Sequence, residues 1–261
     1  MRNQTALITG ASGGIGYEFA KLLAQDCNTL VLVARNGDRL AEVKKELETG
    51  TSVSVLVVEK DLAKPGAADE LYRELRIKNI GVDILVNNAG FGDNGAFSET
   101  DWALEEKMIA VNIIALTQMT KLFVKGMVER KSGRVLNVAS TAAFQPGPFM
   151  AVYYASKAYV LSFSEAIASE LKGTGVTVTV LCPGPTGTGF ATTARMEHSR
   201  LFNLVKPASA ADVARFGYQA MQSGSMVAIH GALNKIMAFS TRMAPRKLLL
   251  LVTRLLNEKA R

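Results

Sequence analysis

Cysteine and histidine are scarce in this 261-residue chain, which has only two of each. Cys27 and Cys182 form no ligand-like pair, and two thiols in a chain of this size are typical of a reducing compartment, not of a disulfide framework. His198 and His230 have no cluster of carboxylates beside them. A metal site and a Ser-His-Asp triad are therefore not expected.

Long hydrophobic runs are also missing. The first ten residues, MRNQTALITG, reach a short apolar run and then a glycine, whereas a secretory signal needs a longer apolar region and a small-residue cleavage site. No stretch approaches the roughly 18 uninterrupted apolar residues of a membrane-spanning helix. We therefore expect a soluble, cytoplasmic protein.

Acidic residues are outnumbered by basic ones, but the imbalance is local. The formal net charge is +7, and the segment 235–261 alone has seven cations against one anion, Glu258. A basic tail on an otherwise balanced chain argues against a protein built throughout to hold nucleic acid. No nucleic-acid partner is expected.

Short apolar runs alternate with amphipathic stretches along the chain. Strands are predicted near residues 6–9, 29–34, 53–59, 84–87, 134–140, 177–182 and 226–229. Helices are predicted at 16–25, 37–48, 67–78, 105–129, 152–172 and 210–223. The strands show little polar alternation, as expected when helices cover both faces of a parallel sheet. The pattern predicts a single α/β domain with a doubly wound parallel sheet of about seven strands.

No linker or internal repeat divides the chain. We expect residues 1–234 to form the α/β domain and residues 235–261 to form a basic, amphipathic helical extension of that same domain. Right-handed crossovers would place the loops that follow the strands along one sheet edge, where ligands of such folds bind.

A glycine-rich turn joins the first predicted strand to the first helix. Gly10, Gly14 and Gly16 allow a sharp turn and a close approach to a pyrophosphate, and the following helix N-terminus offers unpaired N–H groups to the anion. Ser12 and Ile15 lie in the same turn and are predicted to contact the dinucleotide. The alternative is a tight strand-to-helix connection without a ligand.

The second predicted strand ends in Ala34 and Arg35, where dinucleotide folds that grip ribose hydroxyls carry an acid. A guanidinium can pair bidentately with a 2′-phosphate, which a carboxylate would repel. Arg35 therefore favours NADP(H) over NAD(H). The alternative is that Arg35 is a solvated surface charge.

With these residues in view, the chain resembles the short-chain dehydrogenase/reductase family across nearly its whole length. The motifs that carry the resemblance are TGASGGIG (9–16), DL (61–62), NNAG (87–90), VN (111–112), NVAS (137–140), YYASK (153–157) and PGPTGT (183–188). The resemblance implies a Rossmann fold, an NADP(H)-dependent enzyme and a homodimer or homotetramer that pairs through helices near Tyr153.

The resemblance also implies roles for individual residues. The catalytic tetrad would be Asn112, Ser140, Tyr153 and Lys157. The glycine turn, Arg35, Tyr153 and Lys157 would contact the cofactor. The other contacts would be Asp61, Leu62, Asn88, Ala89, Gly90, Pro183, Gly184 and Thr188. Asn87 would steady the central sheet. One departure concerns the NADP preference: family members that use NADP often carry a basic residue at the position of Gly13.

Two adjacent tyrosines, Tyr153 and Tyr154, precede Lys157. Helix geometry gives Tyr153, four residues before Lys157, only a modest preference, and the family's Tyr-x-x-x-Lys pattern selects it. A nearby ammonium should lower the phenol pKa, so that Tyr153 protonates the carbonyl oxygen while hydride is delivered to its carbon. Ser140 would stabilise that oxygen, and Asn112 would order a water that links Lys157 to solvent. The alternative is an amphipathic interface helix.

The segment after Thr188 is expected to close over the substrate. Phe190, Met196, Leu201 and Phe202 predict an apolar lid, and residues 146–150 are expected to form the opposite wall. A hydrophobic or medium-sized ketone or aldehyde is therefore favoured over a charged metabolite. His198, in the same segment, is interpreted as a surface residue.

In the basic tail, Pro245 separates two predicted helices, and the second is rich in leucine. Three interpretations stay open: packing on a neighbouring subunit or on the protein's own surface, peripheral contact with an anionic membrane, and cover for an acyl substrate.

Three classes of function also stay open. The first is an NADP(H)-dependent carbonyl reductase or alcohol dehydrogenase acting on a small molecule, with a 3-oxoacyl or steroid-type reductase as its variant. The second is a regulator that binds NADP without turnover. The third is a membrane-surface interaction protein.

Overall fold

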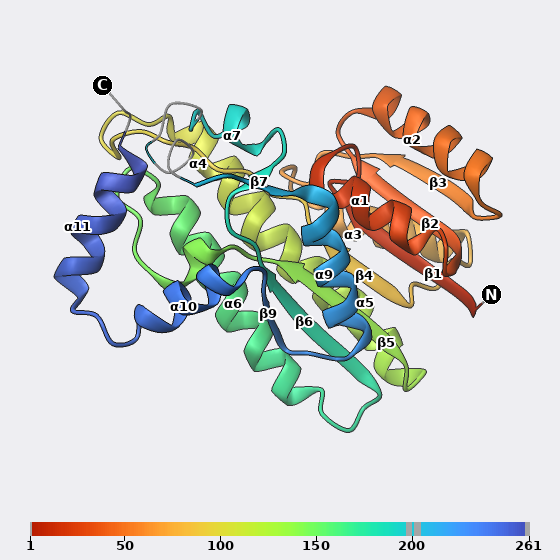
Figure 1. The fold of residues 1–261 in the computed structure, drawn as a ribbon. Helices are drawn as coiled ribbons and strands as arrows, with labels where there is room; N and C mark the ends of the chain where they lie inside the picture. The colour runs from red at the N-terminus through yellow and green to blue at the C-terminus, as the bar shows by residue number, and fades with distance from the viewer. Residues whose placement is uncertain (1, 197–199, 201–204, 259–261) are drawn as a thin grey trace.

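The computed structural model describes residues 2–196, 200 and 205–258, and a seven-stranded sheet forms its centre (Figure 1). All neighbouring strands are parallel, and their order is β3-β2-β1-β4-β5-β6-β9. The strands are β1 (Arg2–Thr9), β2 (Cys27–Ala34), β3 (Ser54–Glu59), β4 (Ile84–Asn87), β5 (Gly133–Val138), β6 (Val176–Cys182) and β9 (Val227–Ile229). The predicted doubly wound Rossmann sheet is confirmed.

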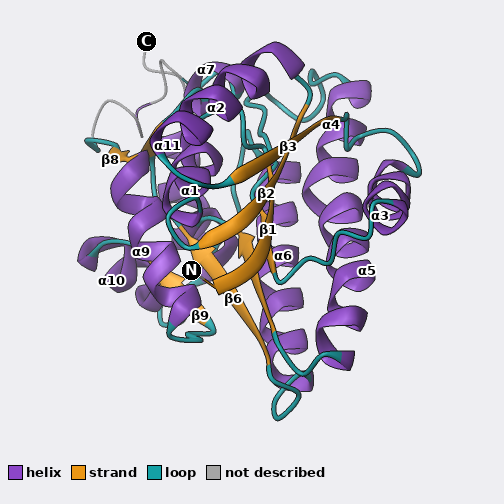
Figure 2. Cartoon of the chain, turned by 90° about the vertical axis from the view of Figure 1, so that its right-hand side faces the viewer, coloured by secondary structure: helices purple, strands orange, loops and turns teal. Residues whose placement is uncertain are grey.

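Helices cover both faces of this sheet (Figure 2). One layer consists of α1 (Gly14–Leu23), α2 (Gly37–Gly50) and α9 (Ala210–Gln222). The other layer consists of α3 (Ala67–Ile77), α5 (Leu116–Glu129) and α6 (Ala151–Glu170). The core divides in the same way, because Ile8 packs in the first layer while its neighbour Leu7 packs in the second. Successive residues of the strand thus face opposite helix layers, and both faces are buried. This is why the strand sequence is apolar throughout and does not alternate between apolar and polar residues.

The strand order reverses between β1 and β4, which are hydrogen-bonded neighbours. In open α/β sheets a crevice forms at such a switch point, outside the carboxyl ends of the strands.

Buried polar side chains form a series of hydrogen bonds between β4, β5 and the helices beside them. The Asn87 side-chain amide donates to Thr120 Oγ1 (3.0 Å) and to Asn137 Oδ1 (2.9 Å), and Asn137 donates to Ser164 Oγ (2.9 Å). Asn87 thus ties β4 to β5, as expected.

The predicted single helix over 105–129 is interrupted. The structure has α4 (Trp102–Ile109), a π-helical turn η1 (Ala110–Ala115) and then α5. A π turn shifts the helix register by a residue, often at a functional site, without changing the apolar character of the sequence. The hydrophobic pattern therefore gave no sign of it.

By length and composition alone, the stretch Trp102–Glu129 is apolar enough to cross a membrane. In the fold, however, Met119, Phe123 and Met127 of this stretch are buried against the sheet. The α5 part of this stretch is therefore a core element of the α/β domain.

Short elements follow the main strands on the side of the crevice. They are the 3-10 turn η2 (Thr141–Phe144), the two-stranded sheet of β7 (Thr186–Gly187) and β8 (Ala208–Ser209), and the short helix α7 (Phe190–Thr193). Helices α10 (Ala232–Ser240) and α11 (Arg246–Asn257) end the chain on either side of Pro245, as predicted. Since α10 already begins at Ala232, the division at residue 235 stays an expectation.

Candidate active site

A cavity of about 980 Å³ lies at the carboxyl ends of the strands. One part, which we call the glycine half, is lined by residues 10, 12–15, 34–36, 60–63 and 88–90. The other part, the apolar half, is lined chiefly by Met150, Tyr154, Phe190, Met196, Leu233, Met237 and Leu256. Ser140, Tyr153 and Lys157 lie along the same cavity.

The glycine turn has the backbone that an anion cradle needs. Gly10 (φ +66°) and Gly14 (φ +54°) adopt left-handed conformations that other residues rarely tolerate. Helix α1 begins at Gly14, two residues earlier than predicted, and no side chain caps its N-terminus at Gly13. The first-turn N–H groups and the positive end of the helix dipole therefore face the glycine half of the cavity.

Gly16 has a different role from the one predicted. Gly16 does not line the cavity; it lies behind the turn, where an added Cβ would come within 2.3 Å of the Gly10 carbonyl oxygen and 2.5 Å of Asn88 Nδ2. Its lack of a side chain lets α1 approach the ends of β1 and β4. Gly16 thus shapes the cradle without touching what the cradle would hold.

Asn88 holds this turn in place. Its side-chain amide donates to the carbonyl oxygens of Thr9 (3.0 Å) and Gly10 (3.2 Å). The Thr9 hydroxyl oxygen in turn accepts from the backbone N–H groups of Asn88 and Ala89, both at 3.0 Å. Sequence reasoning assigned no role to Thr9, although its position directly before the first glycine, at the end of a strand, marks it.

At the far end of the glycine half, Arg35 is exposed and lines the cavity. Within the described part of the chain no ion pair or hydrogen bond engages its guanidinium. Lys60, the other cation here, is held by Glu70 (3.2 Å) and Glu74 (2.7 Å). Asp61 accepts a hydrogen bond from Ala63 N (3.0 Å), which fixes the loop that carries it. Arg35 is thus the cation at this end that is free to meet an anion.

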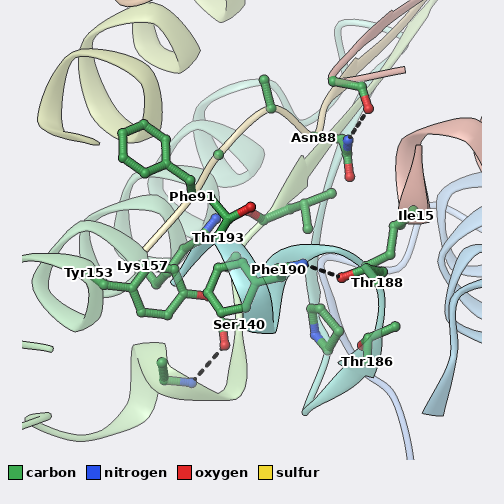
Figure 3. Close-up of a pocket in the computed structure, with 18 of the residues that line it drawn as sticks. Ile15, Asn88, Phe91, Ser140, Tyr153, Lys157, Thr186, Thr188, Phe190 and Thr193 are labelled. Carbon is green, nitrogen blue, oxygen red and sulfur yellow. Dashed lines mark hydrogen bonds between the residues drawn. The ribbon is translucent and has the colours of Figure 1, made fainter. Parts of the chain in front are cut away.

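Ser140, Tyr153 and Lys157 converge in the middle of the cavity (Figure 3). Ser140 lies two residues beyond the end of β5, which is shorter than predicted, and its Oγ caps η2 by accepting from Ala142 N (3.1 Å). Tyr153 and Lys157 lie one turn apart on α6, and both are buried. The Tyr153 hydroxyl is hydrogen-bonded to Ser140.

Burial, not a neighbouring charge, controls the Tyr153 phenol. Desolvation raises its pKa well above the ordinary value, and the hydrogen bond with Ser140 offsets only part of this rise. The expected lowering by the Lys157 ammonium is not found. Lys157 Nζ donates instead to the Val138 carbonyl oxygen at 2.8 Å and lies 5.8 Å from the centre of the Tyr153 ring. Tyr153 is therefore a neutral phenol at pH 7, with its proton available for donation.

Lys157 is shifted toward neutrality. Burial lowers the pKa of its ammonium to about 8, against a smaller raising effect of Cys182. Its Nζ lies behind Gly90, where an added Cβ would be 3.4 Å from Nζ and 3.0 Å from Asn112 Oδ1. A group that titrates near neutral pH inside a cleft is typical of a functional site.

Asn112, in the π turn, lies behind the cavity wall and does not line it. Its amide donates to the Phe91 carbonyl oxygen and to Ser156 Oγ, both at 3.0 Å, and its Oδ1 accepts from Phe91 N at 3.2 Å. Asn112 therefore joins the loop after β4 to helix α6, next to Lys157. Its role in ordering a water stays a prediction.

The two tyrosine hydroxyls have different partners. Tyr153 bonds to Ser140, whereas the Tyr154 hydroxyl donates to Asn257 Oδ1 at 3.1 Å. Tyr154 thereby connects α6 to the tail helix and forms part of the wall of the apolar half. Of the two tyrosines, only Tyr153 is therefore hydrogen-bonded to Ser140, which lies just beyond the end of β5.

The segment after β6 covers the apolar half. The Phe190 ring lies 5.2 Å from the Tyr153 ring, and Met196 is buried in the same cluster. Arg195 forms two hydrogen bonds to the buried Asp93 carboxylate, at 2.8 and 2.6 Å, and so ties this segment to the loop after β4. Leu201 and Phe202 of the predicted lid, like His198, lie outside the described residues.

The remaining predicted contacts lie on the same cavity wall. Ser12, Ile15, Leu62, Ala89, Pro183, Gly184 and Thr188 all line the cavity. Thr188 approaches the glycine turn, since a Cβ on Gly14 would lie 3.0 Å from its methyl group. Gly184 leaves room for Asn234 of α10, whose Nδ2 would lie 2.5 Å from an added Cβ. The tail thus contributes to the cavity, which sequence reasoning had left open.

Comparison with known proteins gives one family. The family described as short chain dehydrogenase matches residues 4–199. The chain is 32% identical to the ketoacyl reductase HetN of Nostoc sp., over 81% of this chain and 74% of that protein. It is 36% identical to the very-long-chain 3-oxoacyl-CoA reductase of Mycosarcoma maydis and to human 17-beta-hydroxysteroid dehydrogenase type 3, over 69% of this chain in both. It spans only 52% and 58% of the lengths of those two proteins.

Solved structures give the same result. A short-chain dehydrogenase from Sphingobium yanoikuyae in complex with NADPH superposes with a TM-score of 0.82 at 29% identity, over 92% of this chain and 94% of that one. A bulky-bulky ketone specific alcohol dehydrogenase from Comamonas testosteroni has a TM-score of 0.79 at 27% identity, over 93% of both chains.

Proposed function

The chain belongs to the short-chain dehydrogenase/reductase family of oxidoreductases, which act on alcohol and ketone groups, and on that premise we propose that it is an NADP(H)-dependent reductase of a hydrophobic ketone or aldehyde. The observation that carries the proposal is the convergence of Ser140, Tyr153 and Lys157 on one buried spot of the cavity, beside a glycine cradle. A protein that only sensed the nucleotide would not need a proton donor there.

The glycine half fits a dinucleotide. Gly10 and Gly14 have the backbone for a close approach, α1 presents its uncapped N-terminus to a pyrophosphate, and Arg35 is free to pair with a 2′-phosphate. When bound there, NADP(H) supplies or accepts the hydride. Asp61 and Leu62 would flank the adenine end, and Lys157 would meet the ribose hydroxyls.

The proton chemistry is left to the protein's own side chains. In reduction Tyr153, a neutral phenol at pH 7, gives its proton to the carbonyl oxygen as charge develops on it. Ser140 Oγ accepts from Ala142 N, and its own hydrogen, which meets the Tyr153 oxygen in the structure, would turn to the substrate oxygen when substrate binds. Lys157, with a pKa of about 8 and one helical turn from Tyr153, would return a proton to the phenolate that remains.

The apolar half supports a hydrophobic substrate. Its wall is built mainly of methionine, leucine and aromatic side chains, with Lys107 as a cation along the same cavity, and the Arg195–Asp93 ion pair of the covering segment does not line it. The ketoacyl and 3-oxoacyl-CoA reductases among the relatives favour a 3-oxoacyl substrate as a second candidate. The hydroxysteroid dehydrogenase relative favours a steroid in the same way.

The test is NADPH and NADH oxidation with ketones, aldehydes, steroids and acyl-thioester analogues. Tyr153→Phe should lower kcat by about 10²–10⁴-fold while NADPH binding is retained, because a positioned proton donor contributes that much. Tyr159→Phe, on the exposed side of the same helix, is the matched control and should turn over normally. Unchanged turnover in Tyr153→Phe would refute the assigned acid, and equal use of both cofactors would refute the NADP preference.

A cytoplasmic location and a homodimer or homotetramer complete the proposal. Both rest on the sequence and on the family resemblance, and sedimentation of the purified protein tests the second.

A further inference from the structure

The tail helix α11 packs with polar side chains inward. Thr253 and Asn257 are buried: Thr253 Oγ1 donates to the Pro146 carbonyl oxygen (2.9 Å), and Asn257 Nδ2 donates to the Pro148 carbonyl oxygen (2.9 Å). Asn94 Nδ2 donates to the backbone oxygen of Asn257 at 3.0 Å. With the bond from Tyr154, these contacts fix the rotation of α11 about its axis. The direction in which its leucines point is therefore determined by the fold.

The opposite stripe of α11 is apolar and faces outward. Leu248, Leu251, Val252 and Leu255 follow the spacing i, i+3, i+4, i+7, which puts them on one side of a helix, and each is 44–56% exposed. A surface helix of a globular protein normally turns such a stripe to the core. Here the stripe has no cover within the described chain.

Helix α10 extends this surface. Ile236, Phe239 and Met243 in and after α10 are all more than 60% exposed. Both helices lie at the same edge of the molecule (Figure 1). Single exposed apolar residues are common, but a set of this size at one edge marks an interaction site. We call these residues and the stripe of α11 the apolar tail face.

The charges beside the apolar tail face have one sign. Arg242, Arg246, Lys247 and Arg254 are exposed, and Glu258 is the one acid among residues 232–258. In a two-fold dimer through this face the cations of one copy would face the cations of the other, which is unfavourable. An anionic partner has no such penalty. Apolar side chains flanked by cations match the interface of a bilayer that contains anionic lipid.

The cavity opens beside the same face. Leu233 and Met237 of α10 line the cavity and are also 62% and 42% exposed, so they form its rim. Leu256 of α11 lines the cavity from the other tail helix. A surface that docked the tail would therefore lie next to the mouth of the apolar half.

We propose that the apolar tail face, on α10 and α11, docks the protein peripherally onto the surface of an anionic lipid bilayer. The leucine stripe enters the headgroup boundary, and the four cations contact the anionic headgroups. Docking needs no turnover, so it stands or fails independently of the proposed reductase activity. It does place the cavity mouth where a hydrophobic substrate could enter from lipid.

The test is co-sedimentation of the full chain with vesicles of phosphatidylcholine alone and of phosphatidylcholine with phosphatidylserine. We expect binding to the second kind, at least about tenfold stronger than to the first and weakened by salt. Leu251→Ser with Leu255→Ser should abolish binding, and Lys247→Glu should weaken it about tenfold. Ile77→Ser, at an exposed residue of α3, is the matched control and should bind like the wild type.

Two results would overturn the proposal. One is that neither vesicle sediments the protein, or that the double serine variant binds as well as the wild type. The other is that the double serine variant dissociates a dimer seen by analytical ultracentrifugation while vesicles bind neither form, which would make the face a contact between copies. The substituted leucines are exposed, so circular dichroism should show an unchanged fold.

Discussion

The two halves of the cavity are built by different means. The glycine half is made largely of backbone: left-handed glycines, a bare helix N-terminus and carbonyl groups held by Asn88. The apolar half is made of side chains from short elements and from a tail helix that joins the body through a few buried hydrogen bonds. In the first half Gly10 and Gly14 leave little room for an added Cβ, whereas the second half can change shape with its side chains. Recognition of the dinucleotide is thus fixed by geometry, and recognition of the substrate is adjustable.

Gly16→Ala should break the glycine half most severely. Its Cβ would meet the Gly10 carbonyl oxygen at 2.3 Å, so the turn or α1 must shift. We expect the free energy of unfolding to fall by about 1–3 kcal/mol and NADPH affinity to fall about 100-fold. Calorimetric titration and denaturant unfolding measure the two effects. Gly13→Ala is the control for stability, because nothing lies within 4 Å of a Cβ there; equal stability loss in both variants would contradict the assignment.

Arg35→Ala should affect the same half less and more selectively. If Arg35 pairs with a 2′-phosphate, its loss should weaken NADPH binding about tenfold or more and leave NADH binding unchanged. Arg39→Ala, nearby on α2, removes a surface cation that pairs with Glu42 at 2.6 Å and should change neither. The Kd values of both nucleotides decide the matter, and a parallel loss for NADPH and NADH would mean that Arg35 reads no phosphate.

Of the three substitutions, Tyr154→Phe should have the smallest effect, and it tests the apolar half. It leaves the buried Asn257 Oδ1 without its donor, which should cost about 1 kcal/mol of unfolding free energy and loosen α11. We expect the KM of a bulky ketone to rise about threefold while the KM of NADPH stays constant. Steady-state kinetics against Tyr159→Phe measure this. An equal change in both KM values would show that the halves are not independent.

The sequence predicted the features that depend on a local pattern of residues. Apolar runs such as 29–34 found the strands, and the glycine turn and Arg35 were found because their roles depend on position next to a strand end. The π turn at Asn112 was missed, since it inserts into an apolar pattern without altering it. The altered environment of Tyr153 was missed because burial is a tertiary property.

The tail shows why the rest could not be predicted. Asn257 bonds to Tyr154 and to the Pro148 carbonyl oxygen, partners more than a hundred residues away, and nothing near Asn257 in the sequence indicates them. The leucine-rich pattern left open whether the leucines meet the protein, a membrane or a substrate. The orientation of α11 follows only from where its few polar side chains find acceptors.

Those acceptors have a consequence for evolution of the enzyme. The backbone oxygens at positions 146 and 148 accept hydrogen bonds from the tail helix, and a backbone acceptor is kept when its side chain is substituted. Gly147 of that loop is sterically fixed, because a Cβ there would lie 2.2 Å from the Tyr154 ring, and the Phe149 ring lies 5.3 Å from the Arg254 guanidinium of the tail helix. The bonds accepted by the carbonyl oxygens of Pro146 and Pro148 do not use the side chains of those two residues. Substitution at these two positions can therefore alter the loop while both hydrogen bonds to the tail helix are kept.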